Sequence, residues 1–376
     1  MNKGTNLREM FFEYVIKSII PISLAVSLLF SGVETSLKQV LKTTIYITNP
    51  DKIFQSMEIQ NSNNESVQES VNNENIITDN DDSIVTSGDI VFENPNDIQK
   101  LINEAKEKYA NSSNDGEIIE CDYSKQNATA EYNEIYLRNT TLNHTVNIEE
   151  YLNKQVYAYI DKDKPSVLIY HTHTTETYEI LDRKYYTNER STRSDNEKEN
   201  MVRVGEEICK ILEENGYKTI HDKTVYDESV NGAYDRSRAR VSKILKDNPS
   251  IQIVLDVHRD SIYQKDGARI KTVTEIKGKK AAQIMLISGC EDGNVTNFPN
   301  WQKNLTFAIN LQKILINENK TLMRPLMFSS RKYNMDLVPC ALSIEIGTDA
   351  NTLSEAIYSA QLFANSLSNF LEEYKI

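Results

Sequence analysis

The residues of this chain that could do chemistry gather where apolar runs end. The run SVLIY is followed directly by His171 and His173, and the run IQIVLDV ends at His258. Glu345 lies between two isoleucines in the run ALSIEIG, where a carboxylate needs a partner in order to be buried. Imidazoles and buried carboxylates are the groups that hold divalent metal ions and move protons.

A hydrolytic zinc ion needs three protein ligands, commonly two histidines and a glutamate, with one position left for water. His173, Glu197 and His258 would supply these ligands. Glu345 would take the proton of the water and pass it to the leaving amine. Each residue alone also has an ordinary structural explanation; Glu197, for example, could serve only the N-terminus of a helix. The four together favour a Zn²⁺ site over four unrelated roles.

Strands alternating with amphipathic helices must position these residues. This alternation predicts an α/β fold with a mostly parallel sheet covered by helices on both faces. Ligands bind such sheets beyond the carboxyl ends of the strands, which is where the histidines fall. The predicted strands are 166–173, 217–222, 251–258, 281–289 and 341–347, and the predicted helices are 199–216, 233–249, 301–319 and 351–376.

The chain before residue 166 is predicted to hold several further parts. From Phe11 to Val33 the sequence is long and apolar enough to span a membrane if Lys17 snorkels, and basic residues precede it. We expect an uncleaved anchor with residues 1–10 in the cytoplasm, and a cleaved signal peptide is the alternative. The expected parts are thus 1–10 (cytoplasmic), 11–33 (anchor), 48–96 (flexible polar tether), 97–165 (small lead-in subdomain) and 166–376 (hydrolase domain).

Overall charge and cysteine spacing exclude other classes of protein. The net charge of −13 argues against nucleic-acid binding, which needs a basic surface. The four cysteines are widely scattered and form no zinc-finger pattern, so buried thiols are expected rather than a disulfide framework. Of the remaining histidines, His144 is predicted to be a surface or packing residue and His221 a structural one.

Seven motifs follow one another along the chain: IYHTHTTETY, NMVRVGEEI, HDKT, AYDRSRARV, DVHRDS, YNMDLVP and IEIGTDANTLSEA. In this order they resemble the stage II sporulation protein P family, and more distantly the zinc-dependent N-acetylmuramoyl-L-alanine amidases. The resemblance implies a zinc amidase-like fold and a membrane-anchored hydrolase that cuts stem peptides from peptidoglycan and also cleaves cross-links. It further implies action during engulfment of the forespore, in the intermembrane space, with stage II sporulation proteins D and M as partners.

The resemblance also implies a role for each candidate residue. It makes His173 a metal ligand, with His171 as its rival, because residues two apart in a strand point to the same side. His258 matches a further ligand. Glu345 matches the catalytic carboxylate near the end of the last strand.

The resemblance also points to the third ligand, and two charged residues lie close to these candidates in the sequence. The ligand glutamate of the amidases precedes a helix, as Glu197 does here, although Glu199 or Asp195 could take its place. Arg259 is expected to stabilise an oxyanion or to hold a substrate carboxylate. Glu176 is expected either to orient an imidazole or to cap a loop.

Three further readings stay open. Arg259 could instead form a salt bridge with Asp256 or Asp260. The whole protein could be a non-catalytic, wall-binding adaptor that positions partner enzymes, or a zinc peptidase that acts only on stem peptides.

Overall fold

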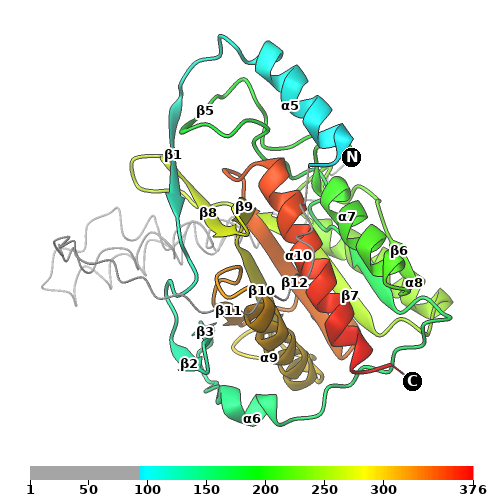
Figure 1. Ribbon diagram of the computed structural model, residues 1–376. Helices are drawn as coiled ribbons and strands as arrows, with labels where there is room; N and C mark the ends of the chain where they lie inside the picture. Colours follow the sequence, from blue (N-terminus) through cyan, green and yellow to red (C-terminus); the bar gives the residue numbers. More distant parts are fainter. Residues whose placement is uncertain (1–93, 376) are drawn as a thin grey trace, which may run out of the picture. The chain divides into compact units, whose positions relative to one another are not determined.

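The computed structural model describes residues 94–375 (Figure 1). The predicted membrane anchor and nearly all of the predicted tether lie outside the described residues. Among the helices that are described, none has the length and apolar character needed to cross a membrane.

The main sheet has eight strands in the order β2-β3-β11-β10-β12-β7-β4-β6 (Figure 1). Strand β10 runs antiparallel to β12, and β2 runs antiparallel to β3, whereas the other neighbouring pairs are parallel. The strands are β2 (Ala130–Tyr132), β3 (Ile135–Asn139), β4 (Val167–Tyr170), β6 (Thr219–His221), β7 (Ile253–Asp260), β10 (Ile284–Gly289), β11 (Leu326–Ser329) and β12 (Cys340–Thr348).

The prediction of a mostly parallel sheet therefore needs correction, since the sheets are mixed. The reason lies between β7 and β10, where the chain contains no crossover helix. It instead forms the hairpin of β8 (Arg269–Ile276) and β9 (Lys279–Ala282), whose strands pair antiparallel. A helical crossover returns the chain in the same direction, but this hairpin delivers β10 to the sheet in the opposite one.

A smaller sheet has the strand order β5-β1-β8-β9, with β1 at Gly116–Cys121 and β5 at Tyr185–Tyr186. The segment 97–165, predicted as a lead-in, contributes β1 to this sheet and β2 and β3 to the main sheet. It also contains α6 (Ile148–Leu152) and most of α5 (Asn96–Lys108). Its strands thus pair directly with strands of the later chain.

Helices cover both faces of the main sheet, as the sequence predicted. On one face, Val167 and Ile169 of β4 pack in the same core as α7 (Met201–Glu214), α9 (Trp301–Glu318) and α10 (Leu353–Glu372). On the other face, Leu168 and Tyr170 pack with α8 (Ala233–Asp247). Successive residues of a strand point to opposite faces, so β4 is buried from both sides.

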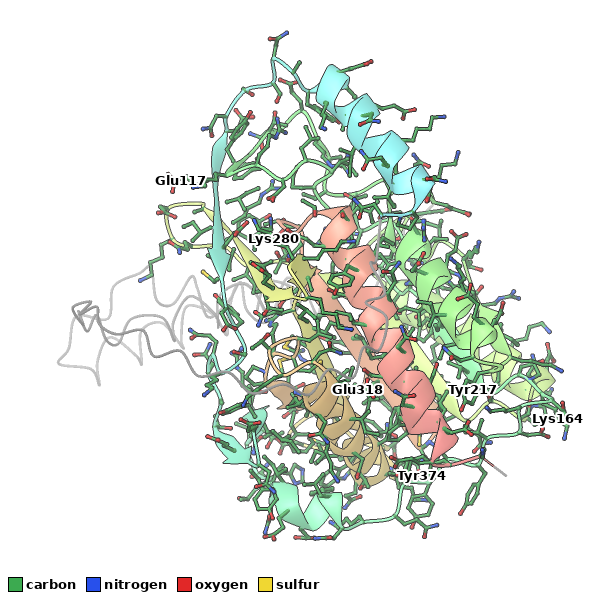
Figure 2. The ribbon with its side chains drawn as sticks, viewed as in Figure 1. Glu117, Lys164, Tyr217, Lys280, Glu318 and Tyr374 are labelled. Atoms are coloured by element: carbon green, nitrogen blue, oxygen red, sulfur yellow. The ribbon has the colours of Figure 1, made fainter. Side chains whose placement is uncertain are left out.

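Polar contacts join the helices to their surroundings at the carboxyl end of α10. Tyr217, which follows α7, donates its hydroxyl proton to Glu372 at 2.8 Å. Asn369 donates to Glu318 of α9 at 2.7 Å, and both Tyr217 and Glu318 are labelled beside α10 in Figure 2. Helix α7 ends before Gly216, whose φ of +85° suits glycine, as the sequence predicted.

Candidate active site

His258 and Glu345 lie side by side at the carboxyl ends of two parallel strands. The register of β7 and β12 pairs these two residues directly, and paired residues on adjacent strands point to the same face. Asp256 stands two residues before His258 on β7 and therefore shares that face. The sequence prediction that brought His258 and Glu345 together is confirmed in this respect.

His173 and Glu176 reach the same place from the loop that follows β4. The imidazole of His173 lies 5.2 Å from that of His258, centroid to centroid, and nearly perpendicular to it. Glu176 Oε2 is 3.5 Å from His258 Nδ1, and Asp256 Oδ1 is 2.8 Å from His258 Nε2. The cluster therefore consists of two imidazoles and three acidic groups, Glu345 included.

The two carboxylates that flank His258 control its charge. Burial opposes the protonated form, but Asp256 and Glu176 hold the pKa of His258 well above its usual value. Nε2 has no hydrogen-bond partner despite its distance to Asp256, so that contact is an ion pair without a well-directed hydrogen bond. Glu176 responds in the opposite direction: burial raises its pKa, but Arg259 and the two histidines lower it well below the usual range.

Glu345 has the properties of a group that exchanges protons near neutral pH. Burial, together with Asp260 and Glu176, raises its pKa to about 8, against the opposing effects of His258 and Arg324. Its Oε2 is buried and has no hydrogen-bond partner among the described residues. A carboxyl group with a raised pKa is suited to general acid and base work.

His173 presents a neutral, unpaired imidazole. Burial lowers its pKa, so the uncharged form that can coordinate a metal ion is favoured. Its Nδ1 is buried and makes no hydrogen bond within the described part of the chain. The ring also meets Tyr234 of α8 edge-on, with the centroids 5.8 Å apart.

His171, the predicted rival of His173, is engaged elsewhere. Its Nδ1 is 2.8 Å from the carbonyl oxygen of Val257, and its Nε2 is 2.9 Å from Nε2 of His221. Both nitrogens are thereby occupied, and both histidines pack under Gly205 of α7. The argument from strand alternation was wrong because β4 ends at Tyr170, and the chain then turns between His171 and His173.

The structure does not bring Glu197 to the histidines. Its side chain is exposed, as is that of Asp195, while Glu199 pairs with Arg190 at 3.2 Å. The carboxylates that act on both imidazoles are Glu176 and Asp256. The sequence feature that could have indicated Glu176 is its position three residues after His173. There the N–H of Glu176 donates to the carbonyl of His173, and this turn brings the carboxylate back to the site.

Arg259, predicted to contact substrate, makes its hydrogen bonds to the loop that follows β4. Its Nε donates to the carbonyl of Thr177, and its Nη2 donates to that of Thr192, each at 3.0 Å. Nη1 lies 3.9 Å from Glu176, so neither of the salt bridges considered from the sequence is the main one. As the neighbour of His258 on β7, Arg259 points to the opposite face of the strand, which explains why it ties down the loop.

The donor atoms of the cluster fit a zinc ion, although they do not form a ready-made site. Within residues 94–375, no group of three or more His, Cys, Asp or Glu side chains is already arranged to hold a metal ion. Three buried polar atoms of the cluster nevertheless lack hydrogen-bond partners: His173 Nδ1, His258 Nε2 and Glu345 Oε2. Nitrogen and carboxylate oxygen are ligands that zinc accepts, and unpaired buried polar atoms are costly unless something binds them.

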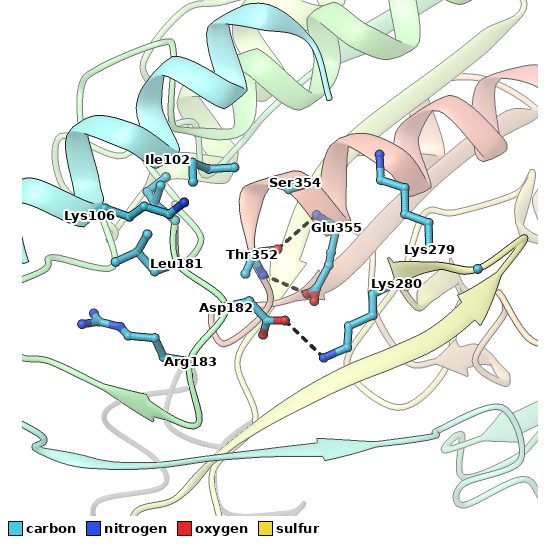
Figure 3. Close-up of a pocket in the computed structure, with 12 residues that line it drawn as sticks. Ile102, Lys106, Leu181, Asp182, Arg183, Lys279, Lys280, Thr352, Ser354 and Glu355 are labelled. Carbon is cyan, nitrogen blue, oxygen red and sulfur yellow. Dashed lines mark hydrogen bonds and ion pairs between the residues drawn. The ribbon is translucent and has the colours of Figure 1, made fainter. Parts of the chain in front are cut away.

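A separate cavity of about 600 Å³ lies between α5, the segment 180–183, the β8–β9 turn and the start of α10 (Figure 3). Two acidic side chains in its lining, Asp182 and Glu355, pair with the buried Lys271 at 2.6 and 2.7 Å. Asp182 also pairs with Lys280, as Figure 3 shows. No residue of the histidine cluster is part of its lining.

The fold and the cluster define an α/β protein with a buried set of imidazoles and carboxylates at the carboxyl ends of adjacent parallel strands. The chain belongs to the family of stage II sporulation protein P (SpoIIP), whose model matches residues 37–368. The resemblance inferred from the motifs is thereby confirmed.

A curated relative is stage II sporulation protein P of Bacillus subtilis (strain 168). It is 30% identical over 218 residues, which cover 55% of this chain and 51% of the relative. The chain thus matches about half the length of that protein.

Two solved structures with some similarity to this chain are amidases. An N-acetylmuramoyl-L-alanine amidase from Clostridium difficile 630 has 14% identity and a TM-score of 0.33, over 56% of this chain and 96% of that one. The CwlD amidase from Clostridioides difficile, in complex with the GerS lipoprotein, has 12% identity and a TM-score of 0.32, over 56% and 98%.

Proposed function

We propose that this protein is a zinc-dependent peptidoglycan hydrolase of sporulation, an N-acetylmuramoyl-L-alanine amidase that also cleaves cross-linked stem peptides. The observation that carries the proposal is the largely buried cluster of His173, Glu176 and His258 beside Glu345, with unpaired buried polar atoms in a protein of the stage II sporulation protein P family. Buried, unpaired polar atoms of this kind are expected where a ligand completes the site.

Three residues would hold the ion: His173, His258 and Glu176. Asp256 would orient His258 by accepting from Nε2, as carboxylates commonly do for metal-bound histidines, and Nδ1, which faces Glu176, would then be the nitrogen that holds the ion. When bound, zinc would supply an acidic water and a polarised substrate carbonyl. Arg259 contributes by keeping Glu176 ionised and by holding the loop that carries it.

Glu345 would move the proton. Burial raises its pKa to about 8. A cation beside it would offset that effect and make the ionised base available. Glu345 then accepts a proton from the attacking water and returns it to the leaving nitrogen, which cannot depart as an amide anion. Its place next to His258 in the β12–β7 register supports this role.

We extend the proposal to the setting of the reaction. The protein would be anchored in the cell membrane by residues 11–33, with its hydrolase domain outside the cytoplasm, in the intermembrane space that faces the forespore. It would act during engulfment together with stage II sporulation proteins D and M. Membership of the family supports this setting.

The test is a digest of purified peptidoglycan by the full chain, with and without a chelator, followed by mass spectrometry of the products. We expect glycan free of stem peptides, loss of activity with chelator, and recovery with Zn²⁺. The variants His258→Ala and Glu345→Ala should be inactive, while Glu197→Ala, which changes an exposed residue, should cleave like the parent.

Other results would contradict the proposal in distinct ways. Undiminished cleavage by both His258→Ala and Glu345→Ala would exclude this cluster as the active site. Binding to peptidoglycan without hydrolysis by the parent would favour the adaptor. Cleavage within stem peptides that leaves their bond to the glycan intact would favour a peptidase.

A further inference from the structure

Two stacked tyrosines form one side of the candidate active site. The rings of Tyr234, on α8, and Tyr333, in the loop between β11 and β12, are 4.6 Å apart and only 12° from parallel. Tyr234 in turn meets the ring of His173 at 84°, with the centroids 5.8 Å apart. The motifs that contain these tyrosines, AYDRSRARV and YNMDLVP, have no role in the mechanism described so far.

The loop that carries Tyr333 is held in an uncommon conformation. Tyr333 and Asn334 have φ angles of +41° and +59°, in the left-handed region that non-glycine residues rarely adopt. Asn334 Nδ2 donates to Ser237 Oγ of α8 at 3.0 Å. Such a conformation persists only where the surroundings enforce it.

Further contacts fix this loop against α8 and the sheet. Arg238 of α8 forms two hydrogen bonds to Asp336, each 2.7 Å long. On β10, Gly289 is needed because a β-carbon there would collide with the carbonyl oxygen of Arg331. A paired guanidinium and a close backbone contact thus hold Tyr333 against Tyr234.

The hydroxyl group of Tyr234 remains available. It makes no hydrogen bond to the described residues. Among the carboxylates, those of Asp256 and Glu345 lie near enough to act on it through their charge. A phenol keeps its proton at neutral pH, so this hydroxyl group can act as a donor. Arg259, the donor expected from the sequence, is tied to backbone carbonyls instead.

We propose that the Tyr234 hydroxyl donates a hydrogen bond to the carbonyl oxygen of the scissile amide as negative charge develops there. Tyr333 is a positioning residue that keeps the Tyr234 ring beside His173. This inference rests on the proposed amide hydrolysis. A preorganised donor in a buried site stabilises the transition state more than the substrate, so its loss lowers kcat.

The test compares Tyr234→Phe with the parent, each as the full chain supplied with Zn²⁺, in peptidoglycan digestion. The variant removes only the hydroxyl. We expect kcat to fall at least about tenfold with KM little changed, because a hydrogen bond to a charged group contributes about 1.5–3 kcal/mol. Bound zinc and the melting temperature should be unchanged. As the matched control, Tyr159→Phe changes an exposed tyrosine and should cleave like the parent.

The role of Tyr333 is tested by Tyr333→Leu, which removes the stacked ring, and by Tyr333→Phe, which keeps it. We expect Tyr333→Leu to lower kcat, whereas Tyr333→Phe should keep most of the kcat of the parent. A smaller fall in kcat for Tyr234→Phe, or an effect on KM alone, would overturn the inference while leaving the hydrolase intact. A parent protein that cleaves nothing would overturn both.

Discussion

Gly205 should not tolerate even the smallest side chain. It lies on α7 directly over the paired imidazoles of His171 and His221, where a β-carbon would come within 2.5 Å of His221 Nε2 and 2.6 Å of His171 Nε2. The carbonyl of Val257 can only accept, so His171 Nδ1 carries the proton. His171 Nε2 must then accept from the N–H of His221. The substitution Gly205→Ala would push directly into this hydrogen bond.

The magnitude follows from three opposing effects. Overpacking a buried contact costs about 1–3 kcal/mol, and losing one buried hydrogen bond costs about 1 kcal/mol more. Alanine in place of glycine favours the helix by about 1 kcal/mol. The net expectation for Gly205→Ala is a loss of about 1–3 kcal/mol in the free energy of unfolding.

The assay is urea unfolding at pH 7 in the presence of chelator, for Gly205→Ala alone and in a His221→Ala background. In that background the hydrogen bond is already absent and the nearest atom is gone, so the same substitution should cost less. A Gly205→Ala protein as stable as the parent, or more stable, would refute the close approach of α7 to the two histidines. An equal cost in both backgrounds would show that His221 is not the obstacle.

Three further predictions concern pH, catalysis and the buried lysine. Burial lowers the pKa of His171 to about 4, and burial together with His171 lowers the pKa of His221 to about 2, so both imidazoles are neutral in the folded protein. The unfolded chain binds these protons below its histidine pKa of about 6.5, so the folded state loses stability as the pH falls below that value. Between pH 7 and pH 5, each histidine should lower the free energy of unfolding of the chelated protein by about 2 kcal/mol, measured by urea unfolding. His221→Gln should reduce this loss by about that amount, and an unchanged loss would contradict the assignment. Glu345→Gln should lower kcat by at least about 100-fold while zinc content, measured by atomic absorption, stays at the parent level, and active Glu345→Gln protein would exclude the proton-transfer role. Lys271→Met leaves the buried carboxylate of Glu355 without its 2.7 Å partner and should cost about 3–5 kcal/mol in urea unfolding, whereas Lys210→Met, at an exposed helix position, should cost little.

Much of the architecture follows from local patterns that a sequence displays directly. Apolar runs ending in His258 and Glu345 predicted strands, and β7 and β12 confirm them. Their adjacency in the sheet was expected because chemistry-bearing residues of an α/β fold collect at the carboxyl ends of neighbouring strands. The prediction of buried thiols also agrees with the structure, because all four cysteines are free and Cys209, Cys290 and Cys340 are buried.

The places where the structure departs from the sequence predictions all lie in loops or at reversals of chain direction. Alternation could not choose between His171 and His173, because it stops where β4 ends. Glu197 was chosen because it precedes a helix, as the ligand glutamate of the amidases does, but its loop leaves it at the surface. A turn instead brings Glu176 to His258. The direction of β10 depended on a hairpin where a crossover helix was the usual expectation.

By itself, the sequence determined the α/β class, the family and the strands that end in His258 and Glu345, because periodicity and motifs are properties of short stretches of chain. Only the tertiary structure decided which carboxylate stands beside the imidazoles, which histidine supports α7, and that Arg259 holds a loop. These outcomes depend on where strands stop and how loops pack against distant elements. Such contacts join residues far apart in the chain, and no local pattern records them.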